Sequence, residues 1–161
     1  VEHQPSSRTV LLKDLTAEGF TFFSNYGSRK AKQIAENKNV SLLFPWYPME
    51  RQVIVIGSAS KTTAQESDSY FASRPRGSQI GAWASAQSDE LSSRDELEKR
   101  YAEFEGKWGE GEQIPRPDFW GGYVVYPTSI EFWQGRYSRL HDRIRYVRVA
   151  NNNWEIKRLN P

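Results

Sequence analysis

The sequence of 161 residues contains no cysteine, two histidines and one methionine. Without cysteine, disulfides and thiolate metal sites are excluded, and two histidines alone do not predict a structural zinc site, so no metal is expected. No apolar run approaches the ~20 residues that span a bilayer, so no membrane partner is expected. Neither sign of charge dominates, because 22 basic and 20 acidic side chains leave a net charge of +2. That balance argues against a nucleic-acid-binding protein.

The start of the chain carries no signal peptide, so a cytoplasmic location is expected. The first residue is valine, and "VEHQPSSR" (1–8) is typical of a turn that leads into a strand. We therefore expect a fragment whose earlier segment is missing or disordered. The length fits one domain, and residues 1–161 are predicted to form it.

Strand-forming residues dominate the first third of the chain. Strands are predicted at 8–13, 20–24, 40–46 and 51–61, the first two joined as a hairpin through 14–19. A helix is predicted after Ser28 as its N-cap, through residue 37. The third strand, "VSLLFPW", is almost wholly apolar, which predicts burial on both faces, and Pro45 is expected at its edge or end. Gly57 predicts a bulge or bend in the fourth strand.

The middle of the chain changes to helical patterns before strands resume. Helices are predicted at 63–73, 78–86 and 93–108, with a loop over 109–118. Late strands are predicted at 119–127, 129–135, 143–150 and 154–159, with a turn at 151–153. This order predicts an α+β fold in which a mostly antiparallel sheet closes as a barrel with peripheral helices.

A cluster of cations follows an aromatic pair in "EFWQGRYSRLHDR" (131–143). If residues 139–143 are extended, Arg139, His141 and Arg143 share one face of the strand. A phosphate would suit this arrangement, because a guanidinium matches its oxygens. The alternative is that these side chains reach solvent separately, or that Asp142 neutralises them.

A second cationic cluster lies in "GSRKAK" (27–32). Arg29 and Lys30 occupy the first turn of the predicted helix, where free backbone N–H groups favour an anion. The alternative is a solvated helix face. Further polar side chains at strand ends are expected to converge on the same place: Arg8, Lys13, Arg51 and Gln52.

A third candidate site lies in "YFASRPRGSQIGAWASAQS" (70–88). Tyr70, Arg74 and Ser78 recur every four residues, although the intervening proline makes one straight helix unfavourable. A phenol, a guanidinium and a hydroxyl can together hold a second phosphate, and Gln87 and Ser88 add further polar groups. The alternative is a surface helix followed by a polar loop.

Aromatic residues make up 14% of the chain, which fits either a ring-rich core or stacking against a planar ligand. Other chemistries find little support. No glycine-rich phosphate loop of common spacing is present, and no nucleophile-elbow motif is visible.

Taken together, these segments resemble the pyridoxine/pyridoxamine 5′-phosphate oxidase family nearly end to end. The segments that carry the resemblance are "RTVLLK" (8–13), "SRKAKQI" (28–34), "ERQVIVIG" (50–57), "YFASRPRGSQIGAWAS" (70–85), "WGGY" (120–123), "IEFWQG" (130–135), "RLHDR" (139–143) and "WEIKRLNP" (154–161).

The resemblance implies an FMN-binding split β-barrel that forms a homodimer with FMN at the subunit interface. It also implies oxidation of pyridoxine or pyridoxamine 5′-phosphate to pyridoxal 5′-phosphate, with O2 as electron acceptor and H2O2 as by-product. No metal is implied.

The family's site residues match positions of this chain. The implied FMN set is Arg8, Thr9, Val10, Leu11, Leu12, Lys13, Phe23, Ser24, Arg29, Lys30, Gln52, Gln87, Ser88, Trp133 and Arg143, with Arg29 and Lys30 at the FMN phosphate. The implied substrate set is Lys13, Tyr70, Arg74, Ser78, Arg139, Leu140 and His141, with Tyr70, Arg74 and Ser78 at the substrate phosphate.

Some features depart from the family pattern. The family's N-terminal segment is absent here, Phe23 stands where some relatives have tyrosine, and Arg136 receives no family role and is expected to be solvated. Two other functions stay open: a related flavin oxidase acting on another small molecule, such as a phenazine precursor, and a non-catalytic protein that stores flavin or pyridoxal phosphate.

Overall fold

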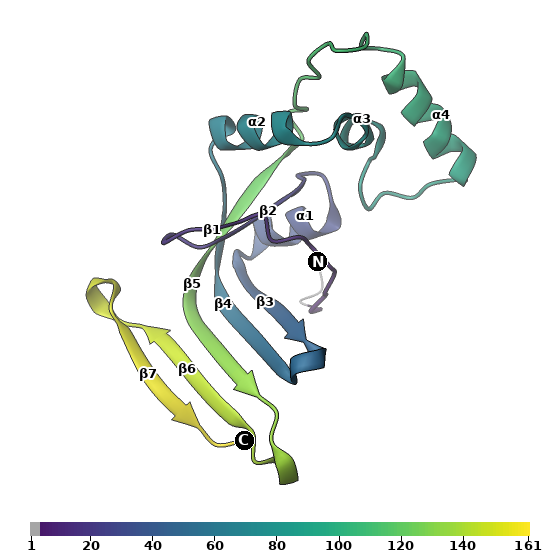
Figure 1. Cartoon of the computed structure of the whole chain (residues 1–161). Coiled ribbons are helices and arrows are strands. Elements are labelled where there is room, and N and C mark those ends of the chain that lie inside the picture. The colour runs from purple at the N-terminus through teal and green to yellow at the C-terminus, as the bar shows by residue number, and fades with distance from the viewer. Residues whose placement is uncertain (1–3) are drawn as a thin grey trace.

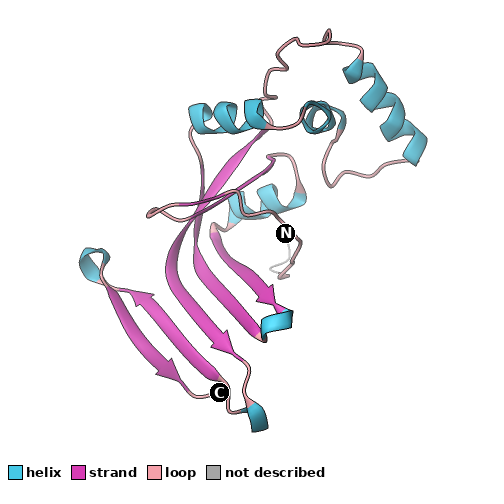
Figure 2. Ribbon diagram, viewed as in Figure 1, coloured by secondary structure: helices cyan, strands magenta, loops and turns pink. Residues whose placement is uncertain are grey.

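The computed structural model describes residues 4–161, which form a curled antiparallel sheet with helices around it (Figures 1 and 2). The strands are β1 (Asp14–Leu15), β2 (Phe20–Asn25), β3 (Asn39–Trp46), β4 (Arg51–Lys61), β5 (Trp120–Gln134), β6 (Asp142–Arg148) and β7 (Trp154–Leu159). The helices are α1 (Arg29–Glu36), α2 (Ala64–Ser73), α3 (Arg76–Ala84) and α4 (Arg94–Glu105), and short 3-10 turns are η1 (Tyr47–Met49), η2 (Tyr137–Arg139) and η3 (Ala150–Asn152).

Strand β5 is the centre of the sheet. The strand order is β1-β2-β5-β4-β3, and β6 pairs with the second half of β5 and with β7. The α2–α4 helices lie at one end of the sheet and the β6–β7 hairpin at the other (Figure 1). All pairings within residues 4–161 are antiparallel, which confirms the predicted α+β class with peripheral helices. No pairing in this range joins β1 to β3, so the sheet of one chain is open and not closed as predicted.

The helices begin where the sequence places capping residues. Ser28 caps α1, and Thr63 caps α2 through a reciprocal capping box with Glu66. The α2 helix stops before Pro75, and α3 begins at Arg76, two residues earlier than predicted. Between residues 4 and 161, none of the helices has the length and apolar character needed to cross a bilayer.

The apolar core has two parts. One part joins the α2–α4 layer to the start of β5 through the buried Phe71, Ile80, Trp108 and Trp120. The other packs α1 against the sheet and is formed by Phe22, Ala31, Ala59, Tyr123 and Val125. Most rings therefore serve the core, but some of those at the first cluster also line a candidate site.

The predicted strand at 8–13 is wrong, and β1 is only two residues long. Residues 8–13 run as an exposed connection whose last member, Lys13, donates its backbone N–H to the Thr21 carbonyl at 2.8 Å. Leu11 is 66% exposed. The apolar composition is that of a strand, but no neighbouring strand in the described part of the chain pairs with it. The predicted turn at 1–8 lies partly outside the described residues, and residues 4–8 form no regular element.

Strand β3 is not buried on both faces as predicted. It pairs only with β4, so it is an edge strand, and alternate side chains such as Leu43 (55% exposed) point away from the core. Pro45 lies near its end, as expected at an edge.

The two strands predicted at 119–127 and 129–135 are one continuous strand, β5. Pro127 does not interrupt it, because it pairs with Gly57 where the β4–β5 register shifts. The shift confirms the predicted bulge, and a proline without an N–H is tolerated there. A side chain at Gly57 would collide with the backbone of Tyr126, so glycine is required for this close approach.

Candidate functional site

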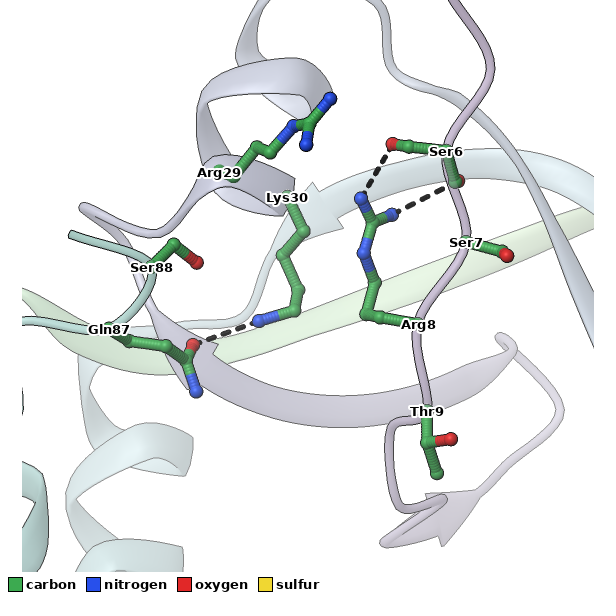
Figure 3. A pocket seen from close by; sticks show the side chains of 8 residues that line it. All are labelled: Ser6, Ser7, Arg8, Thr9, Arg29, Lys30, Gln87 and Ser88. Atoms are coloured by element: carbon green, nitrogen blue, oxygen red, sulfur yellow. Dashed lines mark hydrogen bonds between the residues drawn. The ribbon is translucent and has the colours of Figure 1, made fainter. Parts of the chain in front are cut away.

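A basic pocket lies where the connection before β1, the start of α1 and the segment after α3 meet (Figure 3). It has a volume of about 380 Å³, within the usual range for small-molecule pockets. We define the basic pocket by its lining residues: Ser6, Ser7, Arg8, Thr9, Arg29, Lys30, Gln87 and Ser88. Three cations and the first turn of a helix face one cavity, which suits an anion such as a phosphate.

Lys30 is the least exposed of the three cations of the basic pocket. Its Nζ donates to Ser24 Oγ and to Gln87 Oε1, each at 2.8 Å, and Ser24 Oγ in turn donates to Gln87 Oε1 at 2.9 Å. Burial lowers the pKa of Lys30, and the nearby Arg8 lowers it further. An anion in the pocket would relieve this charge repulsion.

Arg8 is oriented by residues that the sequence analysis did not single out. Its guanidinium donates to Gln33 Oε1 at 2.8 Å and to Ser6 Oγ at 2.7 Å, and Ser6 Oγ donates to Gln33 Oε1 at 2.7 Å. Gln33 lies one turn after Arg29 on α1 and therefore on the same face of the helix. This spacing is the sequence feature from which a role for Gln33 beside the candidate cations could have been predicted. Arg29 itself is exposed at the mouth of the pocket.

A stack of aromatic rings lies beside the basic pocket. Phe23 stacks on Tyr70 with centroids 3.9 Å apart and an interplanar angle of 20°, and on Trp120 at 5.4 Å. Lys13 Nζ lies 5.9 Å from the Tyr70 ring centroid, and the Arg74 guanidinium lies 4.6 Å from that of Trp120. We call these five residues the stacked-ring cluster. Ser24, which accepts a hydrogen bond from Lys30 of the basic pocket, follows Phe23 on β2, so this strand connects the cluster to the pocket.

Arg74 carries an unsatisfied group in this cluster. Its Nη1 is buried and has no hydrogen-bond partner among residues 4–161. Burial lowers the pKa of Arg74. Leaving a buried charged donor unpaired is costly, so an anionic ligand is its natural partner. Tyr70 lies in the last turn of α2, Arg74 at its C-cap and Ser78 in the first turn of α3, so all three predicted phosphate residues line one helix junction.

The two glycines of "WGGY" allow the stacked-ring cluster to form. A Cβ at Gly122 would lie 2.5 Å from Thr62 Oγ1 and 2.9 Å from the Phe23 ring. A Cβ at Gly121 would collide with the Tyr26 hydroxyl. Side chains at these positions would push Phe23 and α2 away from β5, so the motif is explained by close packing.

A third group of predicted site residues lies at the far end of β5. Gln52, Trp133 and Arg143 are direct cross-strand neighbours on β4, β5 and β6. The His141 ring packs against Trp133 with centroids 4.7 Å apart. Together with Arg139 and Leu140 they form what we call the β5–β6 cluster. The row formed by Gln52, Trp133 and Arg143 lies on three neighbouring strands, and all three of these strands were predicted from the alternation of residues in the sequence.

The β5–β6 cluster differs from the predicted extended arrangement of 139–143. Ser138 and Arg139 have φ values of 56° and 61°, so the chain turns before β6 begins at Asp142. Arg139 and Leu140 are exposed, whereas His141 is half-buried. The His141 Nδ1 accepts the backbone N–H of Arg136 at 3.1 Å.

Asp142 neutralises cations other than those expected. It pairs with Arg136 and with Arg158, each at 2.8 Å. The prediction that Arg136 is merely solvated is therefore incomplete, because its side chain is exposed but ion-paired. Arg143 instead pairs with the buried Glu131, a residue to which the sequence analysis gave no role.

The basic pocket and the β5–β6 cluster do not meet within one chain. Ser24 pairs with Gly121 and Gln52 pairs with Trp133, which places them twelve residues apart on β5. At about 3.3 Å per residue the path along the strand is about 40 Å. The predicted convergence of Arg51 and Gln52 with Arg8 and Lys13 is thus wrong for a single chain. Of the remaining predicted FMN residues, Val10 packs on the second core cluster, and Leu11 and Leu12 are exposed.

Two solved structures share this fold over nearly the whole chain. PhzG from Burkholderia lata, solved in complex with tetrahydrophenazine-1-carboxylic acid, has a TM-score of 0.89 and 32% identity, covering 97% of this chain and 75% of PhzG. A pyridoxamine 5′-phosphate oxidase-related, FMN binding protein from Nostoc punctiforme has a TM-score of 0.77 and 13% identity, covering 98% of this chain and 82% of that one. The protein therefore has the fold of the split-barrel class predicted from its sequence.

Comparison with family models and with related proteins identifies the family within this fold class. Residues 2–108 match the model described as pyridoxamine 5′-phosphate oxidase, and 120–161 match the pyridoxine 5′-phosphate oxidase C-terminal dimerisation region. Pyridoxine/pyridoxamine 5′-phosphate oxidases of Streptomyces avermitilis and Pseudoalteromonas translucida are 53% and 56% identical over 158 residues. The matches cover 98% of this chain and 70% and 74% of those proteins. The chain belongs to the pyridoxine/pyridoxamine 5′-phosphate oxidase family, which confirms the resemblance.

Proposed function

We propose that this protein is an FMN-dependent oxidase that converts pyridoxine 5′-phosphate and pyridoxamine 5′-phosphate to pyridoxal 5′-phosphate. The observation that carries this function is the buried, unpartnered Arg74 Nη1 in the stacked-ring cluster. A cation desolvated beside aromatic rings calls for an anionic ligand that carries a flat ring. A phosphorylated pyridine meets both requirements, and the family membership supports it.

The basic pocket fits FMN through its phosphate. Arg8, Arg29 and Lys30 supply positive charge, and Gln87 and Ser88 supply polar groups around the same cavity. Burial and the nearby Arg8 both lower the pKa of Lys30, so an anion bound there would stabilise its charged form. We propose that Arg29 and Lys30 bind the FMN phosphate, and that Ser24 and Gln87 hold Lys30 in place. Thr9 also lines this pocket and adds a hydroxyl.

A homodimer with FMN between the subunits would reconcile the two distant halves of the predicted FMN set. About 40 Å of strand path separates the basic pocket from the row Gln52, Trp133 and Arg143, which is much longer than one FMN. If two copies pack so that the β5–β6 cluster of one faces the basic pocket of the other, both halves can contact one cofactor. The match of residues 120–161 to a dimerisation region supports this arrangement.

The side chains of the chain can then divide the work on the substrate. We propose that Tyr70, Arg74 and Ser78 bind the substrate phosphate at the α2–α3 junction, and that Lys13 contacts the vitamer beside the rings. Arg139, Leu140 and His141 complete the site around the pyridine ring. The chemistry that FMN supplies when bound is two-electron oxidation at C4′ of the vitamer, with O2 as the acceptor and H2O2 as by-product.

The hydrogen bonding of His141 defines what this residue can do. Because Nδ1 accepts the Arg136 N–H, the proton of a neutral imidazole lies on Nε2. Nε2–H can therefore donate to the hydroxyl or amine at C4′ and orient it. The tilted packing of His141 against Trp133 helps to fix the orientation of the imidazole ring.

One other catalytic function is favoured by a specific observation. The similarity to PhzG, which was solved with a tetrahydrophenazine carboxylic acid, favours a flavin oxidase acting on a phenazine precursor. A substrate with one carboxylate would leave part of the Tyr70, Arg74 and Ser78 set without a role. A storage protein for flavin or pyridoxal phosphate would bind these molecules without turnover.

The test is turnover of the FMN-loaded protein in air. Pyridoxine 5′-phosphate should give equal amounts of the 4′-aldehyde and H2O2, whereas unphosphorylated pyridoxine at the same concentration should react far more slowly. Oxidation of a dihydrophenazine carboxylate in preference to the phosphorylated vitamer would favour the second function. Bound FMN without any product would favour storage.

A further inference from the structure

A buried carboxylate lies next to the β5–β6 cluster. Glu131 on β5 is only 7% exposed. Its Oε1 accepts Arg143 Nε at 2.7 Å, and its Oε2 accepts Arg145 Nη2 at 3.1 Å and Nε at 3.3 Å. A buried carboxylate is costly unless it is paired, and here both oxygens are used by cations of one neighbouring strand.

The strand register places this carboxylate beside the predicted cofactor row. Trp133 is opposite Arg143, and Glu131 is opposite Arg145. Residues two apart on a strand share a face, so these four side chains form one block on the β5–β6 surface. Glu131 reaches diagonally across the block to Arg143, and thereby contacts a residue of the proposed FMN site without belonging to it.

The guanidinium of Arg143 is held at two of its three nitrogens. Nε donates to Glu131, and Nη1 donates to the backbone carbonyl of Asn160 at 3.1 Å. No hydrogen bond from Nη2 to another residue is present between residues 4 and 161. Two fixed bonds define the plane of a guanidinium, so Nη2 is aimed in one direction and its donors stay available.

Charge balance favours the same arrangement. Arg143 and Arg145 lie side by side, and their like charges would drive the side chains apart without an anion between them. The hydrogen bond from Arg143 lowers the pKa of Glu131, and Glu131 raises the pKa of Arg143. Glu131 therefore stays ionised and keeps Arg143 in place at neutral pH.

We propose that Glu131 is a positioning residue that orients the Arg143 guanidinium for binding FMN. This inference rests on the proposed function, because it assigns Arg143 to the cofactor. The pre-oriented guanidinium loses little rotamer freedom when FMN binds, so removal of Glu131 weakens cofactor affinity although Glu131 does not touch the cofactor.

The test measures the FMN dissociation constant of the apoprotein by quenching of flavin fluorescence. Glu131→Gln keeps the shape but removes the charge, and we expect at least a 10-fold weaker affinity, about 1.4 kcal/mol. Glu131→Asp keeps the charge but is one methylene shorter. It should also weaken binding, and it carries the test if the glutamine variant does not fold. Thermal unfolding of each apoprotein checks that the fold is intact.

Two comparisons separate positioning from a merely structural role. Arg145→Gln removes the other arm of the same ion cluster but keeps the Arg143–Glu131 pair, and its affinity should stay within about twofold of the wild type. In an Arg143→Ala background, Glu131→Gln should add no further loss, because its effect passes through Arg143.

Three results would overturn the inference. A folded Glu131→Gln protein with wild-type FMN affinity would do so while leaving the proposed function intact, provided that Arg143→Ala weakens binding. Additive losses in the double variant would show that Glu131 acts by another route. A wild-type protein that takes up no FMN would overturn the proposed function, and the positioning role with it.

Discussion

Replacing Arg74 with methionine should raise the stability of the unliganded protein and weaken its binding of the substrate. The buried Nη1 has no partner between residues 4 and 161, and an unsatisfied donor of a charged group costs about 3 kcal/mol. The cation–π contact with Trp120 at 4.6 Å offsets about 2 kcal/mol of that cost, because the guanidinium is desolvated. Methionine keeps contact with the ring and leaves no donor unpaired, so we expect a net gain of about 1 kcal/mol. For a chain of this size the gain raises Tm by roughly 2–4 °C.

The same substitution should weaken use of the substrate. A hydrogen bond to a charged group contributes about 1.5–3 kcal/mol. Losing it at the substrate phosphate should raise KM for pyridoxine 5′-phosphate about 10- to 100-fold. The assays are thermal unfolding of the apoprotein in phosphate-free buffer and H2O2 production at varied substrate concentration.

Arg76 provides a matched control two residues away. Its guanidinium donates to the carbonyls of Trp108, Gly109 and Glu112, each at 2.8 Å, so its donors are already used within the fold. Arg76→Met should therefore lower stability, by about 2 kcal/mol, and leave KM close to that of the wild type. If Arg74→Met instead lowered Tm and left KM unchanged, as expected for Arg76→Met, the reasoning about an unpaired cation would be refuted.

Three further changes test other parts of the site. Arg29→Ala should weaken FMN affinity, by about tenfold for one lost charged contact, and a variant that retains full flavin at micromolar protein would contradict its place at the phosphate. Arg139→Ala should reduce kcat/KM for the vitamer at least tenfold while leaving FMN retention nearly unchanged, and equal loss of both would refute that division of roles. The pKa of Glu131 lies below its ordinary 4.5, so its pairing stabilises the fold above about pH 4.5 and is lost as the pH falls through the lower folded value. Acid unfolding of Glu131→Gln should accordingly be less steep than that of the wild type, and parallel curves would argue against this linkage.

Much of the fold could be predicted because local signals and packing agree. Ser28 and Thr63 begin helices as capping residues do, and Gly57 marks the bulge. The wrong strand predictions have one cause, which is that the sequence of a strand does not show which other strands will pair with it. Residues 8–13 have strand composition but no partner, and the apolar β3 is an edge strand, because pairing is decided by the whole sheet.

The sequence predicted which candidate residues lie near one another better than it predicted the local backbone geometry around them. Tyr70, Arg74 and Ser78 do line one junction, and Arg29 and Lys30 share one pocket with Arg8. Serine and arginine rarely adopt a positive φ, so the turn at Ser138 and Arg139 could not be predicted from these residue types. Residues 139–143 were therefore predicted to be extended. Gln33 and Glu131 were missed because their roles depend on contacts with residues that are distant in sequence. Gln33 accepts a hydrogen bond from Arg8, and Glu131 accepts hydrogen bonds from Arg143 and Arg145 on β6.

The central place of β5 has a consequence for fragment complementation. The two matched regions, 2–108 and 120–161, are separated by a loop in sequence. In space, however, β5 from the second region lies between β2 and β4 from the first. We expect that a chain cut in that loop would yield two pieces with unpaired inner strand edges, each prone to aggregate alone. Mixed together, they would recover flavin binding only by reinserting β5 into the gap.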